Sequence, residues 1–428
     1  MSRGREFLLV VALFVATVIV SAAVWSLLPA EYRENQSTDY LHVYEPVARS
    51  IAAGNGITLD GEIATRYPPG FSVLLAGVFR LADTVGTADE TMLLAFRLVC
   101  VGLAVVLVYG LARLVWSPWA ALLPALAWMT YPFSLWLAKQ PNSEVPFVPV
   151  LYAALFLFWL ALLRGRGGVR SGALFLAAGA LVGAAMLIRP AALGLSVGLA
   201  LIILLFAARE TALRGRLAFG ALVVLGSLLV VLPWEAAVYA RTGEIIPLSS
   251  GGAATIHDGL TFLAVPKEYR REVNVPDDVA ELMWTIHERR GETTTTGGVF
   301  RVMAEEARET PVAFGKLMLI KLARSWYGID SRMLELPTLL IQAVYLLFIG
   351  WGTVYCWRRG GALRRMIGGN WLIVGYFWGM TFLVVPLLRY MAPVMGLLML
   401  ALPGVYYSII AWRRRPTAPR IGSVSSDF

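Results

Sequence analysis

Long apolar runs dominate this sequence and restrict the folds open to it. About ten stretches of roughly 17–25 mostly apolar residues occur, each long enough to cross a hydrocarbon core of about 30 Å as a helix. The composition agrees, because 58% of the residues are hydrophobic and only 15% are charged. The runs also lack the two-residue alternation of a membrane β-barrel. The sequence therefore predicts an all-α polytopic membrane protein.

Basic clusters set the expected orientation of the spans, because Lys and Arg gather in the cytoplasmic loops of membrane proteins. Four clusters close or separate apolar runs: Arg164, Arg166 and Arg170; Arg209, Arg214 and Arg216; Arg358, Arg359, Arg364 and Arg365; and Arg413 to Arg415. The N-terminus, which carries Arg3 and Arg5, is expected on the same side, before an uncleaved first span. The net charge of +9 thus reflects topology, and no basic tract with interleaved aromatics indicates nucleic-acid binding.

The expected spans leave two long segments outside, residues 30–91 and 240–336. The spans cover approximately residues 7–29, 92–115, 118–138, 143–163, 172–188, 190–207, 217–239, 337–357, 370–388 and 391–412. All but three of the 28 Asp and Glu residues then fall in outer segments or near the outer ends of spans, the exceptions being Glu6, Glu210 and Asp427. We therefore expect a multi-pass protein of the plasma or inner membrane whose functional face is extracytoplasmic.

This topology divides the chain into four parts. They are a transmembrane module over residues 1–239 that includes the first outer loop, 30–91; an outer-loop domain over 240–336; C-terminal transmembrane helices over 337–412; and a cytoplasmic tail, expected to be disordered, over 413–428. Two further helices are expected outside the spans. Residues 71–81 are apolar but short, which predicts a re-entrant or interfacial helix. Residues 311–327 predict an amphipathic helix that lies either at lipid head groups, through Lys316, Lys321 and Arg324, or packed on the bundle.

Ionisable groups inside or at the mouth of a membrane span are costly and therefore mark candidate functional sites. Five lie at outer ends of spans: Asp39, Arg97, Glu144, Arg189 and Arg389. Together they predict one outward-facing polar cavity, in which carboxylates suit a base and guanidinium forks suit an anion such as phosphate. Structural alternatives stay open, because an arginine can snorkel to head groups or close an ion pair, and Asp39 can N-cap a helix over residues 40–53.

Several common motifs are missing from the sequence. No P-loop GxxxxGK[ST], no HExxH and no GxSxG occurs, so nucleotide-driven pumps and hydrolases lack their usual signatures. Cys100 and Cys356 lie inside apolar runs and are expected to be core hydrophobes rather than a disulfide. The histidines lack metal-ligand spacing, but Asp39, Glu144 and His257 could converge on a divalent cation, which leaves metal dependence open.

The order of several short motifs resembles that of the GT-C class of membrane glycosyltransferases, and especially the protein O-mannosyltransferase and aminoarabinose lipid A transferase branch. The motifs are Asp39-Tyr40 with Ala48 to Gly54, Arg66-Tyr-Pro-Pro-Gly-Phe71, Phe96-Arg97-Leu98, Ser143-Glu144, Ile188-Arg-Pro190, Leu232-Pro-Trp234 with Gly243 to Pro247, and Leu388-Arg-Tyr390 with Pro393. The resemblance covers residues 1–250 well and 337–412 loosely. It implies a GT-C-like N-terminal module with an active site on the outer face.

The resemblance also implies a reaction, in which a sugar passes from a polyprenyl phosphate to an acceptor hydroxyl on a lipid, glycan or protein. Asp39 matches the family's catalytic loop aspartate and is expected to act as general base in an inverting displacement, with Glu144 as the second catalytic candidate. The mannosyltransferases carry Asp-Glu where this chain has Asp39-Tyr40, a difference that concerns the acceptor. The donor phosphate is expected at Arg66, Arg97, Arg189 and Arg389, and the substrate groove at Tyr40, His42, Tyr67 and His257.

A transporter or flippase for a lipid-linked anion is the main alternative, because arginines and broken helices would also suit such a protein. Many transporters carry two matching halves with interrupted spans, and the sequence has no such symmetry. A non-catalytic membrane scaffold is the third hypothesis. It gives no reason for Asp39, Glu144 and Arg97 to lie on one face.

Overall fold

The computed structural model of the protein describes residues 2–33, 37–165, 167–207, 211–267, 275–329 and 331–413. Helices make up nearly all of these ranges, and their only sheet is one antiparallel hairpin of β1 (Thr58–Leu59) and β2 (Glu62–Ile63). The predicted all-α class is therefore confirmed. Arg166, Arg209, Glu210, Arg414, Arg415 and the predicted tail beyond them lie outside the described residues.

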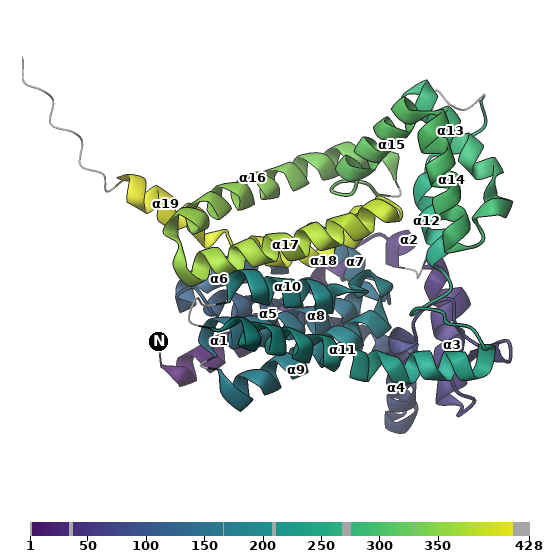
Figure 1. Ribbon diagram of the computed structural model, residues 1–428. Coiled ribbons are helices and arrows are strands. Elements are labelled where there is room, and N and C mark those ends of the chain that lie inside the picture. Colours follow the sequence, from purple (N-terminus) through teal and green to yellow (C-terminus); the bar gives the residue numbers. More distant parts are fainter. Residues whose placement is uncertain are drawn as a thin grey trace, which may run out of the picture.

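The apolar runs form long helices that lie roughly side by side in Figure 1. These are α1 (Arg3–Leu27), α5 (Asp89–Arg113), α8 (Glu144–Arg164), α9 (Gly168–Ile188), α11 (Leu213–Thr242), α16 (Glu335–Arg359) and α17 (Gly361–Leu383). Shorter helices occupy the other expected spans: α6 (Pro118–Met129) with α7 (Pro132–Ala138), η2 (Pro190–Ala192) with α10 (Leu195–Phe206), and α18 (Leu388–Met399) with α19 (Pro403–Arg413).

The polytopic character is clear, but the expected number of ten spans stays a prediction. Within the described part of the chain, seven helical stretches are long and apolar enough to cross a membrane, with α18 and α19 counted as one of them. The count becomes eight if α6 and α7, bent by 54° at their junction, form a single span.

Prolines and glycines explain where several helices begin and end. Arg189 precedes Pro190 and is extended, with φ −146° and ψ 130°, as expected for a residue before proline. The span expected over residues 370–388 was placed too late in the chain. Its helix, α17, begins at Gly361, directly after Gly360 with φ 75°, and ends before the extended Val384.

The two long outer segments meet at one end of the helical bundle. Figure 1 shows the first loop and the second loop together at one end, and the N-terminus and α19 at the opposite end. The Ser250 N–H donates to the Thr65 carbonyl at 2.8 Å, and the two side-chain hydroxyls are 3.2 Å apart. Segments about 185 residues apart in the sequence therefore form one polar end, as the charge pattern predicts.

The first outer loop is built from short helices around the hairpin. They are α2 (Ala30–Arg33), the π-helix η1 (Tyr40–Tyr44), α3 (Glu45–Ala52) and α4 (Gly70–Val85). Helix α4 contains the apolar residues 71–81 and is not among the described helices that could span a membrane, which agrees with the interfacial or re-entrant helix expected there. The helix expected over residues 40–53 is present, but its first turn is a π turn.

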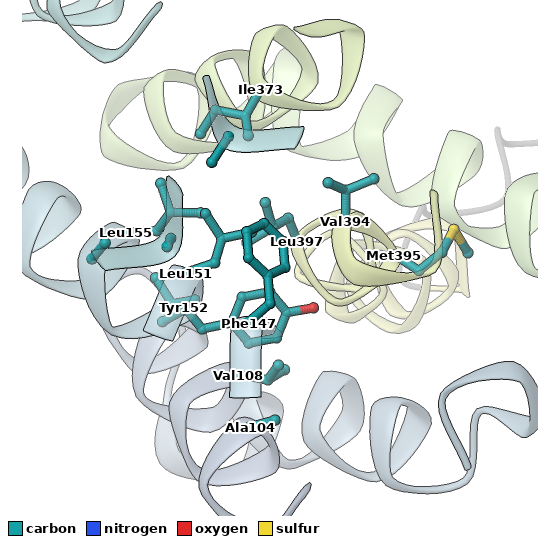
Figure 2. Close-up of a cluster of buried hydrophobic side chains, with 14 of the residues drawn as sticks. Ala104, Val108, Phe147, Leu151, Tyr152, Leu155, Ile373, Val394, Met395 and Leu397 are labelled. Carbon is teal, nitrogen blue, oxygen red and sulfur yellow. The ribbon is translucent and has the colours of Figure 1, made fainter. Parts of the chain in front are cut away.

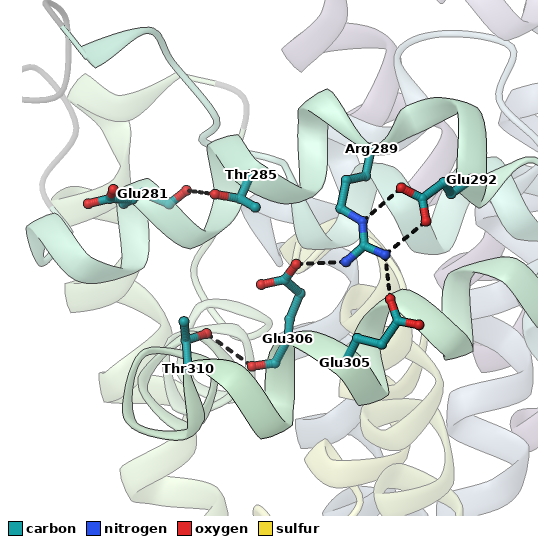
Figure 3. A network of polar contacts seen from close by, with 7 residues as sticks. All are labelled: Glu281, Thr285, Arg289, Glu292, Glu305, Glu306 and Thr310. Carbon is teal, nitrogen blue, oxygen red and sulfur yellow. Dashed lines mark hydrogen bonds and ion pairs between the residues drawn. The ribbon is translucent and has the colours of Figure 1, made fainter.

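The second outer loop folds around its own apolar cluster. Its helices are α12 (Gly252–Leu260), α13 (Asp277–Glu288), η4 (Arg290–Thr293), α14 (Thr296–Glu309), α15 (Pro311–Arg324) and η5 (Arg332–Leu334). The cluster contains Val279, Met283, Ile286, Val299, Val302 and Leu317. Arg289 ties three of these elements together through ion pairs with Glu292, Glu305 and Glu306 (Figure 3).

Helix α15 resolves one of the alternatives left open by the sequence. Lys321 and Arg324 are 1% and 6% exposed, and Lys316 pairs with Asp278 of α13 at 2.7 Å. All three basic side chains thus have partners or packing within the protein. The structure favours packing of this helix on the bundle over contact with lipid head groups.

Helix α8 lies at the centre of the transmembrane core. Phe147, Leu151 and Leu155 project from α8 among Val108 of α5 and Leu397 of α18 (Figure 2). Tyr152, also on α8, is fully buried and donates its hydroxyl hydrogen to the Pro393 carbonyl at 2.6 Å. Burial of such side chains on all faces fixes the position of the N-terminal end of α8, where Glu144 lies.

Glycines bring α9 and α11 into backbone contact. A Cβ atom at Gly179 would lie 2.1 Å from the Val223 carbonyl oxygen, and one at Gly226 would lie 2.2 Å from the Leu176 carbonyl oxygen. Both distances are far below a normal contact, so each position accepts only hydrogen. Small residues at helix interfaces allow this close approach in membrane proteins generally.

We expect the substitution Gly226→Ala to destabilise the protein by about 1–3 kcal/mol, because the added methyl must push α9 and α11 apart. The measurement is the midpoint of thermal unfolding in detergent. Gly198→Ala on α10 is the matched control, since no atom lies within 4 Å of a Cβ there and alanine is the better helix former. An equal fall in both variants would contradict the packing argument.

Candidate functional site

A carboxylate shared by two arginines lies at the end of the bundle where the two long loops meet. Glu144 Oε2 is 2.5 Å from Arg189 Nη1, and Glu144 Oε1 is 3.6 Å from Arg389 Nε. The Glu144 side chain is only 7% exposed and that of Arg189 11%, whereas 39% of Arg389 faces solvent. The site is therefore deep at Glu144 and open at Arg389.

Each of these three residues lies where a helix begins or ends. Glu144 is the first residue of α8, where a negative charge interacts favourably with the helix dipole. Arg189 follows the last residue of α9 and is turned out of the helix by Pro190. Arg389 is in the first turn of α18, an unfavourable position for a cation that Glu144 compensates.

The two arginines keep unused capacity to donate hydrogen bonds. Arg189 Nη1 also donates to the Ser143 hydroxyl at 2.9 Å, and Arg389 Nη2 donates to the Tyr390 hydroxyl at 3.2 Å. Arg389 Nε is buried and has no hydrogen-bond partner among the described residues. A buried donor without an acceptor is costly. Because two positive charges share one negative charge, the arrangement is suited to an additional anion.

Asp39 forms the second half of the site. It precedes η1, but its side chain makes no capping hydrogen bond, so the alternative role of an N-cap is not seen. Its Oδ1 instead accepts a hydrogen bond from the Tyr67 hydroxyl at 2.8 Å, and Asp39 is half-buried. Asp39 also lies near enough to Arg389 to interact with it electrostatically.

Aromatic rings join the two halves. Tyr44 stacks on Tyr67, with ring centroids 5.0 Å apart, and meets Phe71 edge to face at 4.9 Å. The Tyr44 hydroxyl interacts with Ser143, the neighbour of Glu144. A glycine also allows α4 to approach α9 closely, because a Cβ atom at Gly70 would lie 2.6 Å from the Leu187 carbonyl oxygen. The start of α4 therefore rests directly against the end of α9, next to Arg189.

Burial and the neighbouring Asp39 carboxylate raise the pKa of the Tyr67 phenol to about 12. The phenol therefore stays protonated at neutral pH and keeps its role as a donor to Asp39. Burial also raises the pKa of Tyr44. Both rings thus contribute neutral hydroxyl groups to the site.

The structure separates some residues that the sequence groups together. Arg97 donates from Nε to the Leu93 carbonyl at 3.3 Å and from Nη1 to the Lys139 carbonyl, with its guanidinium 5.3 Å from the Trp25 ring centroid. None of these contacts of Arg97 involves Glu144. Arg66 is exposed, with its guanidinium 5.8 Å from the Tyr67 ring centroid, at the opening of the site.

The residues expected to line the groove lie in different places. Tyr67 is in the site, as described, while Tyr40 is buried in η1 and His42 is exposed, donating from Nδ1 to the Thr38 carbonyl at 2.9 Å. His257 is buried in the outer-loop domain, where its Nδ1 is 2.9 Å from the Thr293 hydroxyl. No contact described here joins His257 to the Asp39 side, so its place in the groove stays a prediction.

The hypothesis of a divalent cation held by Asp39, Glu144 and His257 gains no support from this geometry. Across the part of the chain that the structure describes, no group of three or more His, Cys, Asp or Glu side chains could hold a metal ion. The oxygens of Glu144 face two guanidinium groups instead.

Sequence reasoning missed three members of the site: Tyr44, Ser143 and Tyr390. Tyr390 lies between the arginines, with its ring centroid 5.5 Å from the Arg189 guanidinium and 5.0 Å from that of Arg389. Ser143 and Tyr390 occur inside motifs that also contain a charged site residue, and Tyr44 follows Asp39 by five residues. Their closeness in sequence to ionisable residues at the ends of spans is the signal that could have identified them.

A small apolar pocket borders the site inside the bundle. Its walls come from α1, α5, α6, α7, α8 and α18, with Glu144 at one edge. Ser21 lies in the lining, and its hydroxyl is buried without a hydrogen-bond partner among the described residues. The polar site therefore adjoins an apolar part of the bundle.

Comparison with known proteins agrees with this architecture. Residues 66–235 match the family model described as dolichyl-phosphate-mannose-protein mannosyltransferase. This region contains Tyr67, Glu144 and Arg189 but is less than half of the chain. No sequence among the curated proteins matches at a significant level.

Solved structures extend the likeness to almost the whole chain. The archaeal oligosaccharyltransferase AglB from Archaeoglobus fulgidus, in complex with an inhibitory peptide and a dolichol-phosphate, is 16% identical and has a TM-score of 0.54; the match covers 96% of this chain and 52% of that one. The same enzyme tethered to an acceptor peptide gives 16% identity and a TM-score of 0.57, covering 95% and 50%. This chain thus spans about half the length of these archaeal structures.

ArnT from Cupriavidus metallidurans bound to undecaprenyl phosphate is 17% identical, covering 95% of this chain and 78% of that one, with a TM-score of 0.44. At such identities the structural matches report on the fold alone. The family-model match and the shared fold together confirm the prediction that the chain is similar to the membrane glycosyltransferases of the GT-C class.

Proposed function

We propose that this protein is a membrane glycosyltransferase that moves a sugar from a polyprenyl phosphate to an acceptor hydroxyl. The observation that carries the proposal is the position of the Asp39 carboxylate, which Tyr67 holds by a hydrogen bond and which interacts electrostatically with Arg389, one of the two arginines that share the buried Glu144. A base near an anion site is what such a transfer requires. The name of the matched family, and the dolichol-phosphate bound to the archaeal relative, support a lipid-phosphate donor.

In the proposed reaction, the acceptor oxygen attacks the anomeric carbon of the sugar. The bond from that carbon to the phosphate oxygen breaks, and the electron pair leaves with the lipid phosphate. Asp39 takes the proton of the acceptor hydroxyl, and a single displacement inverts the anomeric centre. Tyr67 fixes the Asp39 carboxylate through its hydrogen bond.

Arg189 and Arg389 hold the departing phosphate in this proposal. Both converge on Glu144, and Arg389 retains a buried N–H without a partner among the described residues. Guanidinium groups aimed at the leaving oxygen stabilise the charge that develops there. Arg66 lies at the opening and can extend the anion site, whereas the contacts of Arg97 with two backbone carbonyls direct its guanidinium elsewhere.

Glu144 has a different role from Asp39 in this mechanism. Both of its oxygens face arginines and it is almost fully buried, so it neutralises and positions the anion site. Four arginines, Arg358, Arg359, Arg364 and Arg365, lie around the junction of α16 and α17, at the end of the bundle opposite the site (Figure 1). This arrangement supports a location of the site on the extracytoplasmic face.

We expect Asp39→Asn to lower the rate of sugar transfer by about 10²–10⁴-fold, because the amide keeps the shape of the side chain but cannot accept the proton. The measurement is transfer from a radiolabelled polyprenyl-phosphate sugar, alongside binding of undecaprenyl phosphate, which should not change. Asp83→Asn, an exposed acid on α4 of the same loop, is the control and should retain full activity. If Glu144→Gln abolished transfer with intact binding while Asp39→Asn did not, the base would be Glu144.

We expect Arg189→Ala and Arg389→Ala each to weaken undecaprenyl phosphate binding by about 10–150-fold, the loss of hydrogen bonds to a charged group worth about 1.5–3 kcal/mol. Binding is measured by titration of the detergent-solubilised protein. Arg241→Ala removes an exposed arginine near the end of α11 and is the matched control. Equal weakening in all three variants would indicate general electrostatic attraction rather than a site.

The proposed orientation predicts which positions a membrane-impermeant thiol reagent reaches in intact cells. A cysteine at Thr294, exposed in the outer-loop domain, should be labelled, while one at Val169, exposed in the first turn of α9, should be labelled only after lysis. The native Cys100 and Cys356 are buried and give a low background. Preferential labelling at Val169 would reverse the topology and place the site in the cytoplasm.

A further inference from the structure

The segment that leads into Arg389 is held by the outer-loop domain. Residues Val384–Leu387 connect α17 to α18 without helical structure, and Arg389 follows one residue after α18 begins. Such a link could adopt many conformations on its own. The position of the Arg389 guanidinium opposite Glu144 therefore depends on what fixes this link.

Three hydrogen bonds join the link and its two ends to α15 and the turn that follows. The Lys321 amine donates to the Leu383 carbonyl at 3.5 Å, and Arg324 Nη1 donates to the Pro386 carbonyl at 3.3 Å. The Leu388 N–H donates to the Gly328 carbonyl at 2.7 Å. These bonds hold the backbone before, within and after the link.

Two glycines bring the domain into direct contact with the same link. A Cβ atom at Gly259 would lie 2.4 Å from the Val384 carbonyl carbon, and one at Gly328 would lie 2.5 Å from the Pro386 carbonyl oxygen. Any side chain at either position would push the backbone away. The domain therefore contacts the link from α12 as well as from α15.

The two basic residues are themselves fixed and buried. Arg324 pairs with Glu335, donates to the Ile329 carbonyl at 3.2 Å and stacks at 4.8 Å on the Phe262 ring. Lys321 is 1% exposed, and its described hydrogen bond is the one to the link. Burial of a cation is costly unless it is paired or hydrogen-bonded, so these contacts stabilise both side chains where they lie.

We propose that Arg324 and Lys321 are positioning residues, which hold the Val384–Leu387 link so that Arg389 faces Glu144. Arg389 needs such support for two reasons. The helix dipole repels a cation in the first turn of a helix. The Arg389 side chain is also 39% exposed, so surrounding side chains restrict it less than they restrict Arg189. The effect of Arg324 and Lys321 on substrate binding rests on the proposed role of Arg389 in binding the lipid phosphate. The outer-loop domain thereby sets the geometry of the site without contacting the substrate.

The first test measures the link itself and needs no substrate. A cysteine at Leu387, which is half-buried, is labelled with a maleimide in the detergent-solubilised protein, against the low background of two buried native cysteines. In the Arg324→Gln background the labelling rate should rise about tenfold, the change expected for 1.4 kcal/mol of lost restraint. An unchanged rate would overturn the proposal.

Arg289→Gln provides the matched control. Arg289 also forms an ion-pair network in the outer-loop domain, with Glu292, Glu305 and Glu306, and its described contacts do not involve the link (Figure 3). It should lower domain stability while leaving the labelling rate of the Leu387 cysteine unchanged. An equal rise in both backgrounds would mean that the link responds to domain stability alone, which would also overturn the proposal.

The second test measures binding of undecaprenyl phosphate. Arg324→Gln should weaken binding, Arg324→Lys should partly restore it, and the double variant with Arg389→Gln should bind no more weakly than Arg389→Gln alone. Additive losses would show that Arg324 does not act through Arg389.

If the unmodified protein does not bind this lipid, the proposed function fails, and the labelling rates still decide the positioning role. Should Arg324→Gln not fold, Lys321→Met replaces it in both tests.

Discussion

Glu144 is a carboxylate buried at the end of a central transmembrane helix, and the arrangement of the site follows from the need to neutralise it. A charge in this environment is stable only with close partners. Arg189 and Arg389 supply them from two other helices. Both arginines lie at interruptions between helices, one before Pro190 and one after the Val384–Leu387 link. The breaks in the bundle are thus part of the site, because a continuous helix would keep either guanidinium away from Glu144.

The same arrangement explains how two arginines can stay near the membrane without a bound anion. Glu144 balances one of the two positive charges, and the Ser143 and Tyr390 hydroxyl groups each accept a hydrogen bond from one of the arginines. A partly neutralised pair costs less to maintain than two free guanidinium groups, yet it keeps an excess charge for a phosphate. Removal of Glu144 would therefore affect the arginines first and the reaction only through them. This separates its role from that of Asp39, whose oxygen meets a neutral phenol.

The sequence identifies the charged residues of this site better than the neutral ones. Apolar length gives the helices, and the expense of charge within spans identifies Asp39, Glu144, Arg189 and Arg389. Neutral groups such as Tyr44 and Ser143 carry no such cost, so only the folded chain reveals that they join the two halves of the site. Arg97 shows the converse error, because its position resembles that of Arg189 in sequence, while nearby carbonyls and the Trp25 ring satisfy it locally.

The contacts made by the two outer loops also depend on packing that no local pattern encodes. Gly70 lets the first loop rest on the end of α9 beside Arg189, and Gly259 and Gly328 let the second loop rest on the link before Arg389. In sequence these are ordinary glycines, since only close approach of a distant backbone distinguishes them. Each arginine is thus supported by a different loop. Separate support means that a shift of either loop would change the distance between the arginines, and with it the affinity for an anion held between them.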